Sequence, residues 1–369
     1  MLYKEKNAHG GDVYSVNIVL DYSVNLNPLG TPESVVRAIK NAADYCDRYP
    51  DPNCTELTKA IARHEGVLQG QILCSNGGAE LIYAYCDAVM PERPMVVQPS
   101  FSEYAAGVMR NGVRPIEFMS DPDGQNSFQL DERLPAFIRE QKPDVLFLCN
   151  PNNPDGRLIH SGVLRETIKE CEKTDCRIFL DECFLELSDG YDRSMAGKMD
   201  DHPGLFILKA FTKNYALAGI RLGYGMSSDT ALLGRIAGRL QPWNVSVPAQ
   251  AAGLAALKEK DHVEKARQII KTQREWLAEN LEATGKIKVY PSEANYMLIR
   301  VPEEAGLNEH DCAQNAETHS LAGELLKKGI LIRKCENFRG LGKGWYRICV
   351  RQRQDNDVLV RAIRDAVNK

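Results

Sequence analysis

Three short apolar stretches of this sequence each end in polar residues of a different chemical type. The stretches are Val145–Cys149, Ile178–Leu180 and Leu205–Phe211. The first leads into an asparagine-rich turn that contains Asn153, the second into Asp181 and the third into Lys213. Strands of a doubly wound sheet bring their carboxyl ends to one edge, where ligands gather. We therefore expect an amide, a carboxylate and an amine to lie together.

This set of groups suits pyridoxal phosphate (PLP). A lysine forms the Schiff base, an acid keeps the pyridinium nitrogen protonated, and an amide donates to the phenolate oxygen. Each residue taken alone has a simpler explanation: Lys213 as a solvated lysine at a helix start, Asp181 as a strand-end cap, and Asn153 as part of two turns. Their occurrence in this order, with Arg221 eight residues after Lys213, favours the cofactor.

The elements that would position these residues are indicated by the hydrophobic pattern. From residue 70 to about 245, short apolar runs alternate with amphipathic helical stretches. Runs that are continuous rather than alternating are typical of strands covered on both faces, which predicts a mostly parallel sheet in an α/β domain. Thr31 followed by Pro32 predicts the cap and first position of the first helix.

A different pattern follows residue 248. A long helical region extends to about residue 285, and strand-like runs then mix with helices, which predicts a smaller α+β domain. The runs are Tyr296–Val301, Ile330–Arg333 and Tyr346–Arg351. We expect an N-terminal arm over 1–30, a large domain over 31–245, a small domain over 246–369, and a surface loop over 303–319.

The composition of the chain limits the kinds of partner that we expect it to bind. The net charge of −4 favours neither nucleic acid nor an acidic membrane, and no apolar run is long enough to span a bilayer. The start of the chain lacks the apolar stretch of a secretory signal, so we expect a cytoplasmic protein. Eleven cysteines occur without metal-ligand spacing. We expect no metal, and we expect most of the thiols to be buried and reduced.

The segment from Phe211 to Tyr224 resembles the cofactor-lysine signature of fold-type-I PLP enzymes, the class I and II aminotransferase superfamily. The similarity extends over nearly the whole chain. It implies an aspartate-aminotransferase-like fold, with a mostly parallel sheet in a large PLP-binding domain, and a homodimer with shared active sites. By this resemblance Lys213 and Asp181 are catalytic and hold PLP, and Asn153 contacts the ring hydroxyl.

The remaining cofactor contacts are also implied by the resemblance. Gly78, Ala79, Thr212 and Arg221 would hold the phosphate, Phe101 would stack on the ring, and Tyr49 would reach the phosphate of the neighbouring subunit. Three positions depart from the family pattern: Asp155 and Phe184 replace a threonine and a tyrosine, and Ala79 lacks a hydroxyl. Taken alone, Gly78 also fits a plain helix start and Phe101 a core aromatic.

Four residues would bind substrate by the same resemblance. They are His9, Asn25, Arg333 and Arg347. If their strands pair, Arg333 and Arg347 point the same way and provide two anion sites, which suits a phosphorylated amino acid. The other interpretations are an exposed strand arginine for Arg347 and a mobile terminal residue for His9.

Within the superfamily, the segments His9–Asp12, Leu20–Gly30 and Asp181–Phe184 are similar to the threonine-phosphate decarboxylases of cobalamin biosynthesis. That resemblance implies decarboxylation of L-threonine O-3-phosphate to (R)-1-aminopropan-2-yl phosphate. Histidinol-phosphate aminotransferase or a related aminotransferase is the alternative, because only the orientation of the substrate separates the two reactions. A decarboxylase of phosphoserine and a non-enzymatic PLP-binding module also stay open.

Overall fold

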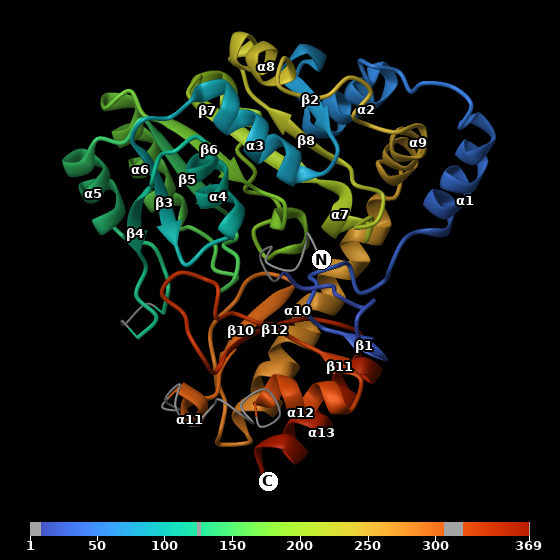
Figure 1. Ribbon diagram of the computed structural model, residues 1–369, viewed down its shortest axis with the longest axis vertical. Helices are drawn as coiled ribbons and strands as arrows, with labels where there is room; N and C mark the ends of the chain where they lie inside the picture. The colour runs from blue at the N-terminus through green and yellow to red at the C-terminus, as the bar shows by residue number, and fades with distance from the viewer. Residues whose placement is uncertain (1–8, 124–126, 306–319, 369) are drawn as a thin grey trace.

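The computed structural model describes residues 9–123, 127–305 and 320–368, and it divides visibly into a larger and a smaller lobe (Figure 1). Most of the loop predicted over 303–319, residues 306–319, lies outside the described residues. Its first residues belong to a short helix, α11 (Pro302–Ala305). Within the described residues, no helix is long and apolar enough to cross a membrane.

A sheet of seven strands forms the centre of the larger lobe, in the order β2-β8-β7-β6-β5-β3-β4. The strands are β2 (Ile72–Ser75), β3 (Pro94–Gln98), β4 (Ile116–Met119), β5 (Val145–Cys149), β6 (Arg177–Asp181), β7 (Leu205–Ala210) and β8 (Gly223–Met226). β8 is antiparallel to both neighbours, and the other pairs are parallel. The predicted mostly parallel α/β sheet is confirmed.

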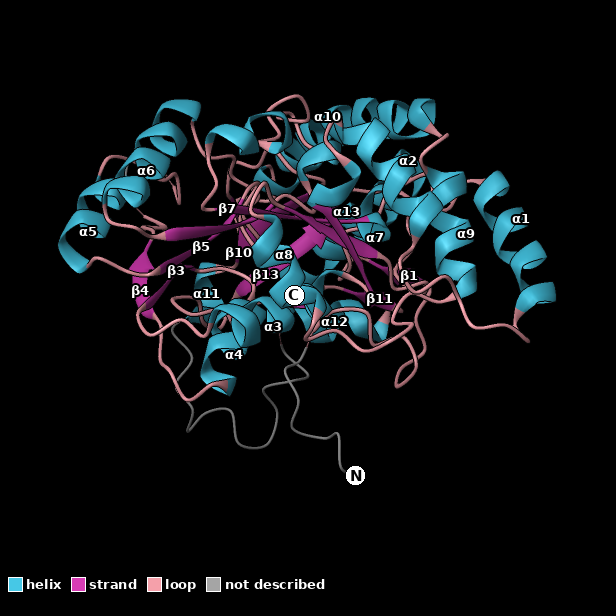
Figure 2. Ribbon diagram, turned by 90° about the horizontal axis from the view of Figure 1, so that it is seen from above, coloured by secondary structure: helices cyan, strands magenta, loops and turns pink. Residues whose placement is uncertain are grey.

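Helices cover both faces of this sheet, as its continuous apolar strands require. Seen from above, α5 and α6 lie on one face and α3, α4 and α8 on the other (Figure 2). These five helices are α3 (Gly78–Val89), α4 (Ser102–Arg110), α5 (Arg133–Gln141), α6 (Ser161–Lys173) and α8 (Thr230–Ala237). All residues of β3, β5 and β7 are buried between these layers.

The first helices of the larger lobe pack beside the sheet. α1 (Glu33–Ala42) contacts α9 (Val247–Ala256), and α2 (Thr55–Glu65) contacts β2 and α9. The predicted cap of α1 is wrong, because the helix begins at Glu33 with Pro32 as its cap. The Thr31 hydroxyl instead donates to the carbonyl of Ala216, which ties the start of α1 to the loop after Lys213.

The smaller lobe contains a four-stranded antiparallel sheet in the order β12-β13-β10-β9. Its strands are β9 (Lys288–Val289), β10 (Tyr296–Arg300), β12 (Arg333–Lys334) and β13 (Trp345–Cys349). The predicted run Ile330–Arg333 is divided between two sheets, because β11 (Ile330–Leu331) pairs with the arm strand β1 (Leu20–Asp21). Helices α12 (Leu321–Lys327) and α13 (Arg353–Val367) complete this lobe.

Helix α10 (Lys260–Glu282) runs from one lobe into the other (Figure 1). Ile270 of α10 belongs to the apolar core around the large sheet, and Leu277 belongs to the core of the smaller lobe together with Tyr22 of the arm. The boundaries at 30 and 245 stay a prediction. The apolar contacts of α9 and of the first half of α10 are made with the large-lobe core.

Candidate active site

Lys213 lies on the one-turn helix α7 (Phe211–Asn214), directly after β7. The arm supports this turn, because the backbone N–H of Asn27 donates to the carbonyl of Lys213 over 3.0 Å and its side chain donates to the carbonyl of Asn214. Burial lowers the pKa of Lys213 to about 8, and the positive charges of Arg347 and Arg221 add to this effect. A lysine with a lowered pKa is a nucleophile near neutral pH.

Asp181 ends β6 and is 6% exposed. One carboxylate oxygen accepts a hydrogen bond of 2.6 Å from the Tyr104 hydroxyl, and the other accepts 2.9 Å from the backbone N–H of Cys183. Burial raises the pKa of this carboxyl, which the two hydrogen bonds partly offset. Sequence reasoning missed Tyr104, since nothing in its spacing pairs it with a residue that is 77 positions away.

The turn after β5 places Asn153 at the same edge of the sheet. Asp155 stabilises the turn, because its buried carboxylate accepts 2.8 Å from the backbone N–H of Arg157 and also accepts from the Asn152 side chain. The threonine of the family pattern can therefore be replaced by an aspartate that fixes the turn. The carbonyl oxygen of the Asn153 side chain accepts from the Arg347 guanidinium, which links the two lobes.

The start of α3 forms a cradle with Arg221. Gly77 has φ of +80°, and a Cβ added there would lie 2.6 Å from a guanidinium nitrogen of Arg221. A Cβ on Gly223 would lie 2.8 Å from the backbone nitrogen of Gly78, so β8 approaches the helix start closely only because it carries a glycine. A helix N-terminus beside a guanidinium is suited to a phosphate.

All predicted cofactor contacts except Tyr49 line one cavity of about 180 Å³. They are Gly78, Ala79, Phe101, Asn153, Asp181, Thr212, Lys213 and Arg221. An adjoining cavity of about 200 Å³ is lined by all four predicted substrate residues, His9, Asn25, Arg333 and Arg347. Phe101, Asn153, Phe184 and Lys213 line both. We treat the two cavities as one site, with Lys213 at their junction.

Arg333 and Arg347 face each other directly across the β12–β13 pair, and each is 7% exposed. Their hydrogen-bond partners are neutral: Arg333 donates to a backbone carbonyl and to Asn337, and Arg347 donates to the Asn153 side chain and the Ser23 carbonyl. Within the described part of the chain, neither arginine forms an ion pair. Burial lowers the pKa of both, for Arg333 to about 10.

Asn25 presents a second sign of a polar ligand. Its side chain is buried, and neither its amide nitrogen nor its amide oxygen has a hydrogen-bond partner among the described residues. Nε of Arg347 is buried without a partner in the same way. Buried polar groups are normally satisfied, so these atoms indicate donors and acceptors that a bound molecule would complete.

Tyr49 is the predicted site residue that the structure does not bring into either cavity. It is 78% exposed, and its ring stacks on Trp243 with centroids 4.4 Å apart. Its role toward a neighbouring subunit stays a prediction.

A buried ionic cluster lies beneath the turn that carries Lys213. The Lys209 ammonium is 2.7 Å from Glu65 and 3.9 Å from Glu186, and Glu186 accepts 2.8 Å from the side chain of Asn214. His64, Glu65 and Glu186 hold ligand atoms close enough for a metal ion. Lys209 already supplies the cation there, so we assign the cluster to the support of α7.

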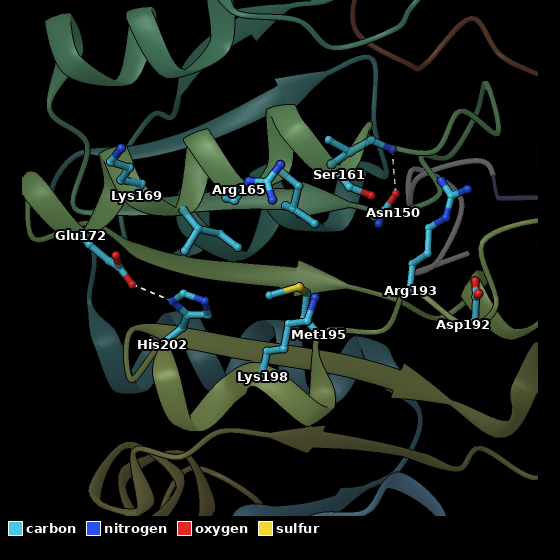
Figure 3. A pocket seen from close by; sticks show the side chains of 13 residues that line it. Asn150, Ser161, Arg165, Lys169, Glu172, Asp192, Arg193, Met195, Lys198 and His202 are labelled. Carbon is cyan, nitrogen blue, oxygen red and sulfur yellow. Dashed lines mark hydrogen bonds and ion pairs between the residues drawn. The ribbon is translucent and has the colours of Figure 1, made fainter.

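A separate cavity of about 350 Å³ lies between α6 and the 3-10 helix η4 (Ala196–Asp201), and Figure 3 shows it from close by. It contains none of the predicted site residues. Its charged side chains, such as Arg165 and Lys198, are exposed to solvent. We place the active site at Lys213.

The groups around Lys213 fit PLP on structural grounds. The cavity offers a half-buried amine, a buried carboxylate with two donors, an aromatic ring and a cradle with a helix start and a guanidinium. These are the groups that a pyridine ring with an aldehyde and a phosphate requires.

Comparisons with known proteins agree with this site. The family model "Aminotransferase class I and II" matches residues 17–363. The threonine-phosphate decarboxylase of Salmonella typhimurium is 32% identical, over 98% of this chain and 97% of that protein. A histidinol-phosphate aminotransferase of Methanosarcina mazei is 30% identical, over 93% of this chain and 87% of that protein.

A solved structure extends the comparison to the fold. The histidinol-phosphate aminotransferase from Clostridium acetobutylicum has a TM-score of 0.83 and 29% identity, and the match covers 95% of this chain and 99% of that one. The expected aspartate-aminotransferase-like fold is confirmed.

Proposed function

Because this chain belongs to the class I and II aminotransferase family, we propose that it is a PLP-dependent decarboxylase of L-threonine O-3-phosphate, with (R)-1-aminopropan-2-yl phosphate as product. Membership of this family implies PLP as the cofactor, and the relatives include both decarboxylases and aminotransferases. The narrower assignment rests on the charges of the substrate cavity.

The observation that carries the proposal is the pair of buried arginines, Arg333 and Arg347, opposite each other in register. Like charges directly across a strand pair destabilise the sheet, and buried charges without counter-ions are costly. A ligand with two anionic groups removes both costs. A phosphorylated amino acid carries a carboxylate and a phosphate, and so meets this requirement with a molecule that also has an amine for Lys213.

When bound, PLP supplies an electron sink for a bond that breaks at the substrate Cα. Lys213 would hold the cofactor and later deliver a proton to Cα from its amine. Asp181 would keep a proton on the ring nitrogen, supported by Tyr104, and Asn153 would donate to the ring oxygen. Arg347 would orient the carboxylate, because of the two arginines in the substrate cavity it is the one that donates to Asn153, which also lines the cofactor cavity.

The phosphate cradle would be completed across a homodimer. Tyr49 is exposed and supported by Trp243, as a residue that reaches a neighbouring subunit would need to be. We include this dimer in the proposal, with Tyr49 on the phosphate of the partner's cofactor.

Amino transfer from histidinol phosphate is the second candidate, and the 30% identity to such an enzyme favours it. Phosphate binding would be the same in both reactions, and Lys213 would move a proton in both. Histidinol phosphate has no carboxylate on the carbon that bears its amine, so only a hydrogen can be removed there, whereas O-phosphothreonine offers a carboxylate that the site can orient for loss as CO2.

The two candidates differ in their need for a second substrate. With O-phosphothreonine and no keto acid, a decarboxylase releases many equivalents of CO2 per active site, whereas an aminotransferase releases none and stops after its first half-reaction. We expect continuous CO2 release, which Lys213→Ala abolishes. Glutamate formation from 2-oxoglutarate with histidinol phosphate, without CO2 from O-phosphothreonine, would overturn the proposal.

A further inference from the structure

His9 of the N-terminal arm is held by a buried carboxylate on another element. Glu103 lies in the first turn of α4, and its Oε1 is 3.0 Å from Nε2 of His9. The Glu103 side chain is only 12% exposed. Its other oxygen accepts a hydrogen bond from the Tyr83 hydroxyl on α3. Glu103 therefore connects the arm to the helix whose start forms the phosphate cradle.

Two glycines allow the arm to take this path. A Cβ on Gly10 would lie 2.4 Å from the Ser23 carbonyl oxygen, and Gly11 has φ of +90°. The Gly11 N–H donates to the Ser23 hydroxyl over 2.8 Å, while the Ser23 carbonyl accepts 2.9 Å from Arg347. The arm is thus fixed at two places: Gly11 is bonded to Ser23, next to Arg347, and His9 is held by Glu103.

His9 takes up a defined place in the substrate cavity. Its ring centroid lies 5.7 Å from that of Phe101, and it lines the cavity with Arg333 and Arg347. An ionised carboxylate can only accept, so Glu103 directs Nε2 of His9 to donate and thereby fixes the orientation of the ring. Arg347 donates to Asn153, which lines the cofactor cavity as well, and this leaves Arg333 and His9 for the second anionic group.

We propose that Glu103 is a positioning residue that holds His9 in the substrate cavity, where the imidazolium, through its Nδ1–H, and Arg333 bind the phosphate monoester of the substrate. The proposal deepens the function given above and rests on it, because it assumes a phosphorylated substrate. Without the carboxylate, His9 would have to be ordered on the arm each time a substrate binds, and this ordering would weaken the affinity.

Inorganic phosphate, titrated calorimetrically into the PLP-loaded protein, tests this role without turnover. Glu103→Ala and His9→Ala should each weaken phosphate binding by about tenfold, the effect of one charge-assisted hydrogen bond. The double variant should be no weaker than His9→Ala, because both changes remove the same interaction. Glu103→Gln keeps the shape and an acceptor oxygen, so it should restore part of the affinity.

Tyr83→Phe is the matched control, since it removes a hydrogen bond from Glu103 without touching His9, and it should change phosphate affinity by less than Glu103→Ala does. The absorbance of bound PLP in every variant reports an intact cofactor site. Additive losses in the double variant, or a wild-type protein that binds no phosphate, would overturn the proposal. If the losses of phosphate affinity are coupled but O-phosphothreonine yields no CO2, only the decarboxylase assignment is overturned.

Discussion

At the scale of single residues, the reactivity of the site depends on how the surroundings of Lys213 set its charge. The amine has a lowered pKa because of burial, and Arg347 and Arg221 contribute in the same direction. Asp181 shows the opposite balance, since burial raises its pKa while Tyr104 and Cys183 stabilise its charged form. Lys213 is thereby suited to exchange a proton near neutral pH, while the donors to Asp181 favour the charged form that a pyridinium nitrogen requires.

A pH titration tests the state of Lys213. In the cofactor-free protein, the rate of PLP uptake should rise with pH around a midpoint near 8 rather than near the ordinary 10.5, because only the neutral amine attacks. Arg347→Gln removes a neighbouring positive charge, which favours the ammonium form, so its midpoint should move upward.

Arg353→Gln provides the control for loss of a positive charge, because Arg353 is exposed on α13 and pairs with Asp357. Its midpoint should equal that of the wild type. A wild-type midpoint near 10.5, or a downward shift in Arg347→Gln, would contradict the assigned environment of Lys213.

At the scale of elements, the phosphate cradle requires close approach between a helix start and the segment after Lys213. Arg221 itself adopts a left-handed backbone with φ of +59°, and its guanidinium lies against Gly77. Of the two adjacent glycines at the start of α3, Gly77 is therefore required for a steric reason, because a side chain there would collide with Arg221. The sequence indicates a helix start at Gly78, but it does not reveal this contact, which joins segments more than 140 residues apart.

Gly77→Ala should both strain the backbone and displace Arg221. We expect a loss of about 1 kcal/mol in the free energy of unfolding and at least a tenfold weaker Kd for PLP. Gly66→Ala is the matched control: Gly66 has φ of +72° at the end of α2 and no neighbour within 4 Å of an added Cβ. It should lose similar stability and keep its PLP affinity. Equal PLP affinity in the two variants would argue against the cradle.

The strands of the two sheets differ in how well the sequence predicts them. Val145–Cys149 is predicted with the bounds of β5, since its five residues are all buried and apolar. The run Ile330–Arg333 reads as one strand but serves two sheets, because β11 pairs with the arm and β12 with β13. Local hydrophobicity cannot distinguish these partners, which are chosen by tertiary packing.

At the scale of the whole molecule, the site lies where the two lobes and the arm meet. Arg347 of the smaller lobe donates to Asn153 of the larger one, and Asn27 of the arm supports the turn of Lys213. Helix α10 contributes to both hydrophobic cores, with Ile270 in the core of the larger lobe and Leu277 in the core of the smaller one. The two cavities therefore depend on contacts between segments that are distant in sequence.

This arrangement explains what could be predicted from the sequence. Residues at strand ends, such as Asp181 and Lys213, follow from the parallel sheet. Arg333 and Arg347 are implied by the family resemblance, and the pairing of β12 with β13 explains why they lie opposite each other. Tyr104 and Glu103 could not be found, because each acts through a hydrogen bond to a residue more than 75 positions away and belongs to no recurring spacing. The substrate preference depends on orientation within the cavity, which no motif records.

The most direct test of the central claim is to reduce the PLP-loaded protein with borohydride and map the modified peptide by mass spectrometry. Borohydride makes the bond between cofactor and lysine permanent, so the label reports where PLP was held. We predict one pyridoxyl group per chain, on Lys213, and none after the change Lys213→Ala. A label on Lys209 or another lysine, or no label at all, would contradict the assignment of this cavity as the PLP site.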